Sequence, residues 1–383
     1  MASFFLSYDQ IDDLAAGCSL LGSGGGGDTH AFSLVLRSLL ARGRRVSVVD
    51  PDELDPEALI VNVGFVGAPV TLQEKLIAEI EIVSAVEAMR RRLGRPIDAL
   101  MASEIGGGNG LAPFIAGALL NLPVVDADGM GRAFPLSDHV AYSIYGHSAL
   151  PTVVASEHGE VAIIEAGTNR QVERLLRALS VAMGSKCFSA DYPLRGADVR
   201  KCAVPRTVSL ALSIGAAVRD ARVHYGDPLN ALRRLLHDGR GLAVSLLFEG
   251  TVVDCQHDVR AGFGVGRILL AQPGCDRVEV AIDFQNEFLI ARREGAPIAT
   301  TPDIISVTDA ETFRAISADA VRYGQRVKVI AIAAPLLMCT DLALSVVGPR
   351  AFGFDVDYRS IALTSEQPVE TSRCAPGTAT VSK

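Results

Sequence analysis

Residues 98–129 read DALMASEIGGGNGLAPFIAGALLNLPVVDADG, and this stretch has the pattern of a β–α–β unit. An apolar run at 98–107 predicts a buried strand, 110–122 predicts an apolar helix, and 123–129 predicts a second strand. A helix that connects two neighbouring strands of one sheet makes them parallel, with a right-handed crossover. The stretch therefore predicts a parallel sheet covered by helices.

The same alternation extends toward the N-terminus. Strands are predicted at 45–50 and 58–67, where β-branched residues form continuous apolar runs, as in strands buried on both faces. Helical periodicity predicts helices at 8–18, 31–43 and 72–94. We therefore expect an N-terminal three-layer α/β/α domain with a mostly parallel sheet.

Beyond about residue 135 the apolar runs become shorter. Strands are expected at 139–146 and 343–348, helices at 169–184 and within 204–240, and mostly strands from 241 to about 363. Short strands separated by Gly, Pro and Asp are typical of a barrel or sandwich. We expect a C-terminal β-rich, barrel-like domain with some helices.

The domain boundaries follow from this change of pattern. Residues 1–167 are predicted to form the α/β ligand-binding domain and 168–365 the β-rich domain. Residues 366–383 lack an apolar period, which predicts a flexible tail.

The composition limits the classes of function. The chain has 383 residues, of which 49% are hydrophobic and 21% charged, which is typical of a folded enzyme. Its formal net charge of −8 argues against nucleic acid and against an anionic membrane surface as partners. Seven cysteines without CxxC spacing predict neither a disulfide framework nor a zinc ribbon. The N-terminus has no basic region of a signal peptide, so a cytoplasmic location is expected.

A glycine-rich segment, GSGGGGD at 22–28, precedes the helix predicted at 31–43. Each glycine costs about 0.5–1 kcal/mol relative to alanine in regular structure, which indicates positive φ angles or a close approach of the backbone. Amides at a helix N-terminus can hold an anionic or carbonyl group. A structural turn is the alternative. The run has neither a good dinucleotide fingerprint nor a P-loop lysine, so no nucleotide is expected. The candidate substrate contacts here are Gly24, Gly25, Gly26, Gly27 and Asp28.

A second glycine turn, SEIGGGNG at 103–110, lies at the carboxyl end of a predicted strand, where open α/β sheets bind ligands. Glu104 is a candidate general base or metal ligand. Asn109 is either a donor to a substrate carbonyl or a plain helix cap. Gly107 and Gly108 are further candidates for substrate contact.

A third candidate loop follows the strand at 123–129. Asp126 and Asp128 are two positions apart and would share one face of a regular strand. Such a pair can act as acid and base or bind a divalent cation, while a simple Asp-Gly turn is the alternative. Arg132 is a candidate for binding a substrate carboxylate. The cofactor stays open, with a divalent metal ion as the candidate.

A polar run, Gln285–Glu287, interrupts a strand-like segment in the second half. Consecutive strand residues alternate between faces, so at least one of the three side chains points inward unless a bulge intervenes. Asn286 and Glu287 are therefore added to the candidate substrate contacts.

Seven motifs in this order resemble a bacterial family once catalogued as a domain of unknown function and now called S-methyl thiohydantoin desulfurase. The resemblance covers about residues 8–363. The motifs are LLGSGGGGD (20–28), EIGGGNGLAPF (104–114), LPVVDADGMGRAFP (122–135), DFQNEFL (283–289), PDIISV (302–307), RYGQRVKVIAI (322–332) and VGPRAFGFDVDY (347–358).

The resemblance implies an N-terminal three-layer α/β domain and a C-terminal β-rich domain. It also implies hydrolytic removal of a sulfur substituent from a five-membered, cyclic imide-like ring. Members of this family are often neighbours or fusion partners of hydantoinase and oxoprolinase-type proteins, so a hydantoinase-type partner is expected, and a homo-oligomer is a further expectation.

These observations predict a hydrolase of a small cyclic substrate. Glu104 or Asp126 would activate water, directly or through a divalent ion, while glycine amides stabilise the developing negative charge. The alternative is a non-catalytic small-molecule sensor or an accessory subunit of a hydantoinase-like enzyme. A kinase is disfavoured because the phosphate-binding motifs are missing.

Overall fold

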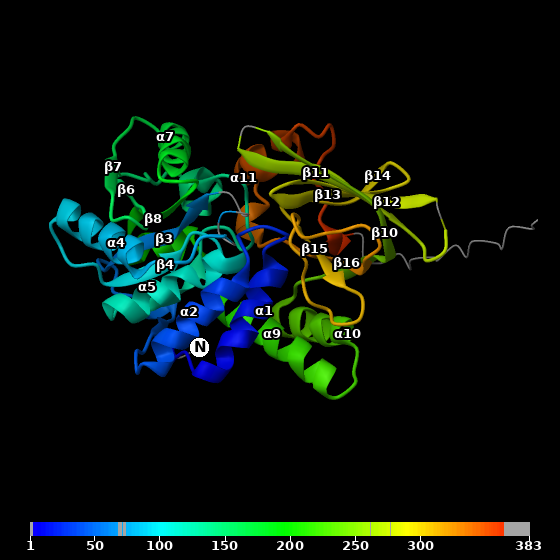
Figure 1. Cartoon of the computed structure of the whole chain (residues 1–383), viewed down its shortest axis with the longest axis horizontal. Coiled ribbons are helices and arrows are strands. Elements are labelled where there is room, and N and C mark those ends of the chain that lie inside the picture. Colours follow the sequence, from blue (N-terminus) through cyan, green and yellow to red (C-terminus); the bar gives the residue numbers. More distant parts are fainter. Residues whose placement is uncertain (1–2, 68–70, 72–73, 261, 276, 364–383) are drawn as a thin grey trace, which may run out of the picture.

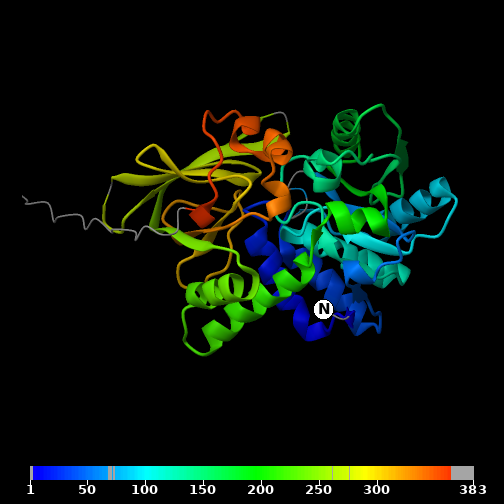
Figure 2. The same cartoon turned by 180° about the vertical axis from the view of Figure 1, so that it is seen from behind.

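The structure, a computed structural model, describes residues 3–67, 71, 74–260, 262–275 and 277–363. Two sheets lie side by side, and helices α1, α9 and α10 run beneath them (Figures 1 and 2). The predicted tail at 366–383 lies outside the described residues. Within the described part of the chain, every helix is too short or too polar to cross a bilayer.

The first sheet has a parallel centre and antiparallel edges. Strands β2, β5, β4 and β3 are parallel neighbours, as the β–α–β pattern predicts, and the remaining pairings are antiparallel. In spatial order the strands are β1 (Phe4–Phe5), β2 (Ser47–Val49), β5 (Val124–Asp128), β4 (Ala99–Ala102), β3 (Leu59–Gly67), β8 (Lys186–Arg195), β6 (Thr152–Ala155) and β7 (Val161–Ile164), with β9 (Val204–Pro205) paired to β5.

Helices cover both faces of this sheet, which confirms the predicted three layers. One apolar core lies under α1 (Ile11–Leu21), α2 (Thr29–Ala41), α4 (Glu79–Leu93), α5 (Ala112–Leu120), α9 (Thr207–Val223) and α10 (Pro228–Arg233). A second core lies on the opposite face, under α6 (Ala141–Ile144), α7 (Asn169–Ala182), α8 (Gly196–Cys202) and α11 (Asp341–Val347). Short 3-10 helices are η1 (Tyr8–Gln10), η2 (Pro51–Glu53), η3 (Gly107–Gly110), η4 (Ser137–His139), η6 (Leu336–Met338), η7 (Pro349–Phe352) and η8 (Ile361–Leu363), and η5 (Arg234–Asp238) is a π-helix.

The second sheet is antiparallel throughout and has its own apolar core, which confirms a β-rich C-terminal domain. In spatial order its strands are β14 (Ala296–Thr300), β13 (Glu287–Arg293), β12 (Val278–Gln285), β11 (Phe263–Ala271), β10 (Val244–Arg260), β16 (Arg326–Ile332) and β15 (Ile304–Asp309). The sheet curls into a half-barrel, in which β13 and β14 at one end of the sheet come into contact with β15 at the other end.

Several predicted elements differ from the structure. The strand expected at 139–146 is η4 followed by α6, and the one expected at 343–348 lies in α11, which Thr340 caps by accepting a hydrogen bond from the Ala343 amide. Short apolar runs do not show whether the backbone is helical or extended. Strand β8 was not predicted, and it joins the first sheet between β3 and β6.

Two buried side chains of the first half bind the backbone of the second sheet. The Ser23 hydroxyl donates to the carbonyl of Ile305 at 2.8 Å. The Arg132 guanidinium, fully buried, donates to the carbonyls of Asp303 at 2.8 Å and Phe288 at 3.1 Å. These bonds hold β15 and the start of β13 against the first half of the chain.

Candidate active site

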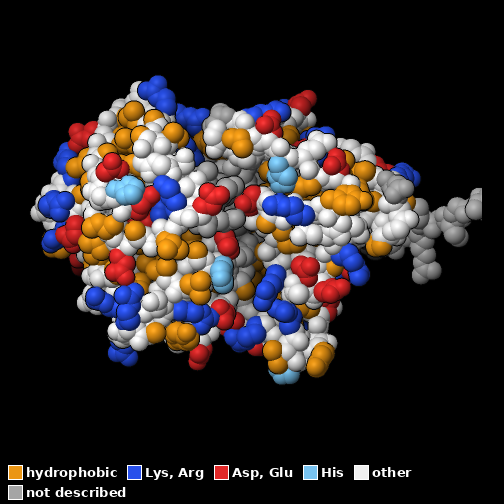
Figure 3. Space-filling model, viewed as in Figure 1, with side chains coloured by type: hydrophobic (Ala, Val, Ile, Leu, Met, Phe, Trp, Pro, Cys, Tyr) orange, Lys and Arg blue, Asp and Glu red, His pale blue; other side chains and the backbone are white. Residues whose placement is uncertain are grey.

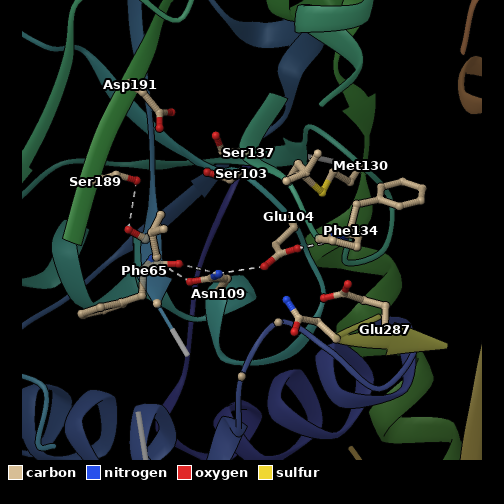
Figure 4. A pocket seen from close by; sticks show the side chains of 18 of the residues that line it. Phe65, Ser103, Glu104, Asn109, Met130, Phe134, Ser137, Ser189, Asp191 and Glu287 are labelled. Carbon is tan, nitrogen blue, oxygen red and sulfur yellow. Dashed lines mark hydrogen bonds between the residues drawn. The ribbon is translucent and has the colours of Figure 1, made fainter. Parts of the chain in front are cut away.

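A cleft lies between the two halves, at the carboxyl ends of β3 and β4. It contains about 670 Å³ of empty space, counting the solvent at its mouth. Acidic side chains gather where the two halves meet on the face in Figure 3. Figure 4 shows the polar groups inside the cleft. This is the edge of the sheet at which the sequence predicts a ligand.

The two glycine segments pack against each other through their backbones. The amides of Gly108 and Asn109 donate to the carbonyls of Gly27 and Gly26, at 2.9 and 3.1 Å. A β-carbon on Gly26, whose φ is +76°, would lie 2.1 Å from the carbonyl oxygen of Gly106. The glycine-rich composition therefore reflects a close approach of two loops.

Only some of the predicted glycines reach the cleft. Gly26 and Gly27 line it. The other predicted glycines contact neighbouring protein instead: a β-carbon on Gly24 would meet the Phe288 ring, one on Gly25 the Glu287 side chain, one on Gly107 the backbone of Gly25 and Gly26, and one on Gly108 the Phe32 ring.

Asn109 orients Glu104. Its amide oxygen accepts from the Phe65 backbone N–H at 2.7 Å, and its Nδ2 donates to the Phe65 carbonyl at 3.1 Å and to Glu104 Oε1 at 2.8 Å. Asn109 thereby fixes the end of β3 and one oxygen of the carboxyl, and it does not cap a helix through its side chain. Both residues line the cleft.

Burial raises the pKa of Glu104 to about 7. The hydrogen bonds from Asn109 and from the Phe134 amide, the latter 3.3 Å long, act in the opposite direction by stabilising the charged form. A carboxyl with a pKa near 7 is ionised in part of the molecules at neutral pH, and in that form it can accept a proton as a general base.

Glu287 faces Glu104 in Figure 4. It starts β13 directly after Asn286, which has φ +58° and accepts a 2.9 Å hydrogen bond from the Gly264 amide. Asn286 and Glu287 both line the cleft. Burial and the nearby Glu104 charge raise the pKa of Glu287 well above its usual value, although Arg132 opposes this shift. Among the described residues, Glu287 Oε2 has no hydrogen-bond partner.

Asp126 and Asp128 do not line the cleft. Asp126 Oδ1 accepts from the Ser209 amide at 3.0 Å in the first turn of α9. Asp128 Oδ2 accepts from the amides of Ile105, Met130 and Gly131, at 2.8 to 2.9 Å. Burial raises the pKa of Asp128 to about 7, against the effect of these bonds. Asp128 therefore ties together the loops that follow β4 and β5.

Two other predicted contacts also lie outside the cleft. Asp28 is exposed and caps α2 by accepting from the His30 amide at 3.0 Å. Arg132 joins the two halves through the carbonyls of the second sheet and stacks on the Phe134 ring at 4.7 Å. No group of three or more His, Cys, Asp or Glu side chains within the described ranges is arranged to hold a metal ion.

Further polar residues line the cleft that sequence reasoning missed. Ser189 and Asp191 come from β8, and Ser103 follows β4. Asn62 lies behind them, and its Nδ2 donates to Ser103 Oγ at 2.8 Å and to Asp191 Oδ1 at 3.1 Å. The polar residues inside β8 are the sequence feature that could have indicated this part of the site. They could indicate it only if the strand itself had been predicted.

Arg177 of α7 is the cationic side chain in the lining of the cleft. Its guanidinium donates to Glu173 Oε1 at 2.6 Å and to the Pro135 carbonyl at 2.6 Å. Arg177 lies over the Phe263 ring at 5.1 Å, so it connects α7 to the second sheet. Its positive charge acts on both Glu104 and Glu287 and favours their ionised forms.

Comparisons with known proteins agree with this two-part organisation. Models of the S-Me-THD-like N-terminal and C-terminal domains match residues 9–166 and 167–361. A crystal structure of a protein from Chromobacterium violaceum is similar, with a TM-score of 0.79 and 26% identity, over 94% of this chain and 100% of that chain. No curated protein matches. Since the family models together match residues 9–361, the chain belongs to the S-Me-THD-like family, as its resemblance to S-methyl thiohydantoin desulfurase predicted.

Proposed function

We propose that the protein is a hydrolase that removes the methylthio group from a five-membered, cyclic imide-like ring of the S-methyl thiohydantoin type. The observation that carries the proposal is the pair of buried carboxyls, Glu104 and Glu287, which face each other in the cleft and both have raised pKa values. Two such groups can hold one proton between them at neutral pH, as an acid and a base require. Membership of the S-Me-THD-like family supports the substrate class.

The two carboxyls have different roles in this reaction. Glu104, which titrates near neutral pH, takes a proton from water as the water oxygen attacks the ring carbon that carries sulfur. Glu287 stays protonated and gives its proton to the departing sulfur. A C–O bond forms and the C–S bond breaks. Methanethiol leaves with the proton from Glu287, and the second proton of the water remains on a ring nitrogen beside the new carbonyl. The proton that Glu104 took from the water then passes to Glu287, which restores the starting state of both carboxyls.

Gly26 and Gly27 are the glycines assigned to stabilise the developing negative charge. Both line the cleft directly before α2, and the N-terminal end of a helix favours negative charge. The Gly108 amide is already bonded to the Gly27 carbonyl, so it is left out of this role.

The test is release of methanethiol from an S-methyl thiohydantoin by the purified protein. We expect release by the wild type, and a loss of at least about 100-fold in Glu104→Gln and in Glu287→Gln. Asp13→Asn is the matched control: the pKa of this carboxyl is also raised by burial, but it pairs with Arg219 outside the cleft. Ligand-induced stabilisation without methanethiol would instead indicate a sensor or an accessory subunit.

A further inference from the structure

Three polar residues at the other end of the cleft form an ordered donor–acceptor unit. Asn62 is buried behind the cleft, and both hydrogens of its Nδ2 are used, one toward Ser103 Oγ and one toward Asp191 Oδ1. An amide nitrogen donates only, so the Ser103 oxygen must accept this bond. An ionised carboxylate only accepts, so Asp191 in its ionised form fixes the orientation of the Asn62 amide.

The two residues that line the cleft consequently have opposite hydrogen-bonding roles. Ser103 accepts from Asn62 and keeps its hydroxyl hydrogen free to donate to a ligand. Asp191 can only accept while it is ionised. Both are within hydrogen-bonding distance of the same Asn62 nitrogen, and Figure 4 shows them at the same end of the cleft, away from Glu287. A donor and an acceptor therefore lie next to each other.

We propose that Ser103 and Asp191 recognise the carbonyl and the adjacent N–H on one edge of the substrate ring. Ser103 donates to the ring carbonyl, and the ring N–H donates to Asp191. An amide inside a five-membered ring is forced to be cis, so its C=O and N–H point to the same side, as this pair of residues requires. The inference rests on the proposed function, and it adds that the ring nitrogen on this edge must carry hydrogen rather than an alkyl group.

The burial of Asp191 makes this contact selective. The residue is 3% exposed, so a ligand that cannot donate leaves a desolvated carboxylate with one hydrogen bond fewer, held only by Asn62 and Ser189. Hydrogen bonds to a charged group commonly change affinity by about tenfold to a hundredfold. Ser189, which also lines the cleft, has two acceptors within the protein, the Gly64 carbonyl at 3.2 Å and the Asp191 carboxylate, and so does not replace Ser103 as the donor to a ligand.

The test measures the affinity of hydantoin, 1-methylhydantoin and 3-methylhydantoin by isothermal titration calorimetry at pH 8. We expect at least one methylated ring to bind the wild type about tenfold or more weakly than hydantoin. In Asp191→Asn this difference should disappear, because hydantoin itself loses the contact. In Ser103→Ala all three rings should bind more weakly and the difference should remain.

Two results would overturn the proposal. One is equal binding of all three rings to the wild type. The other is an unchanged difference in Asp191→Asn, which would mean that the methyl group is excluded by shape. The assay needs no turnover, so a protein that fails to release methanethiol but discriminates among the rings refutes only the proposed hydrolysis.

A second measurement covers the case in which Asp191→Asn does not fold. Burial raises the pKa of Asp191 to about 7, so the discrimination by the wild type should shrink between pH 8 and pH 6, and a difference that did not change with pH would count against the proposal. The charge of Glu173 of α7 raises the pKa of Asp191 further, and the charge of Asp191 in turn raises the pKa values of Tyr142 of α6 and Tyr192 of the same strand. Because the pKa of Glu104 is also raised to about 7, the pH comparison is repeated with Glu104→Gln, in which the discrimination should still shrink between pH 8 and pH 6.

Discussion

Gly25 and Glu287 are in direct contact, although one lies in the first glycine loop and the other begins a strand of the second sheet. A β-carbon on Gly25 would lie 2.0 Å from Oε1 of Glu287. The missing side chain at position 25 therefore leaves room for the carboxyl that faces Glu104. Gly25 supports the candidate site by its small size, without lining the cleft itself.

Alanine at two neighbouring glycines should have different effects. Gly25→Ala displaces the Glu287 side chain, so methanethiol release should fall about tenfold or more with little change in the free energy of unfolding. Gly26→Ala places a β-carbon against the Gly106 backbone at a positive φ and should destabilise the fold by about 1–3 kcal/mol. Kinetics and urea unfolding of both variants separate the two effects. Full activity of Gly25→Ala would contradict the role of Glu287.

The pH profile should be bell-shaped. Because the pKa of Glu104 is about 7, kcat/KM should rise as this base ionises through neutral pH. It should fall again at higher pH as Glu287, whose pKa is raised well above its usual value, loses its proton. The apparent pKa values belong to the pair. The measurement is initial rate against pH from 5 to 10, and a flat profile would exclude an acid–base role for these groups.

The stability of the wild type should decrease with rising pH because of Glu104. The pKa of Glu104 is about 7 in the folded protein, and its ordinary value, 4.5, applies to the unfolded chain. Between these two pH values the folded state therefore binds more protons than the unfolded state. The stabilising effect of protonation is complete below pH 4.5 and is lost as pH rises through 7. At pH 8 the free energy of unfolding of Glu104→Gln should therefore be up to about 3 kcal/mol higher than that of the wild type. Near pH 4.5 the two free energies should be equal. Urea unfolding at both pH values measures the difference. An equal gain at both pH values would contradict the assignment.

Asp126→Ala should reduce stability without reducing the activity of the folded protein. The substitution leaves the buried Ser209 amide in the first turn of α9 without its acceptor, at a cost of about 1–3 kcal/mol. Denaturant midpoints and the rate of methanethiol release by the folded fraction test this. If the fully folded variant released methanethiol about 100-fold more slowly than the wild type, Asp126 would again be a catalytic candidate.

Arg132→Met should weaken the junction of the two halves. It removes the donor of the Asp303 carbonyl and leaves the Phe288 carbonyl with only the 3.2 Å contact from the Ser23 hydroxyl, which should cost about 2–5 kcal/mol. We also expect faster proteolytic cleavage between the halves. Arg42→Met is the control, since its ion pair with Glu79 is exposed. Unchanged unfolding of Arg132→Met would show that other contacts hold the halves together.

Local patterns predicted most of the N-terminal fold but not every strand. Runs rich in β-branched residues identified β2 and β3, and in β3 positions 59–65 are buried without interruption, as in a strand covered on both faces. Strand β8 carries buried polar residues, Lys186 and Asp191 among them, and has no such pattern. Lys186 is tolerated because it pairs with the buried Glu81 at 2.8 Å, a contact that no local rule reveals.

Alternation along a strand agrees with the shared face of the two aspartates but does not say what that face contacts. Val125 and Ala127 of β5 belong to the second core, whereas Asp126 and Asp128 both reach the first turn of α9, at Ser209 and Thr207. Asp128 also binds the loops that follow β4 and β5. Glu104 and Asn109 were singled out by their place after a parallel strand, and both line the cleft at the carboxyl end of β4.

The amino-acid sequence by itself determined the helices and strands with regular apolar periods, the glycine-rich edge of the first sheet, and the family. Only the tertiary structure decided that Glu104 meets Glu287 and that Asp191 meets Ser103 through Asn62. The physical reason is that periodicity reports which face of an element is buried, whereas contacts between distant residues depend on how the two sheets pack. The raised pKa values follow from that packing, because they come from burial.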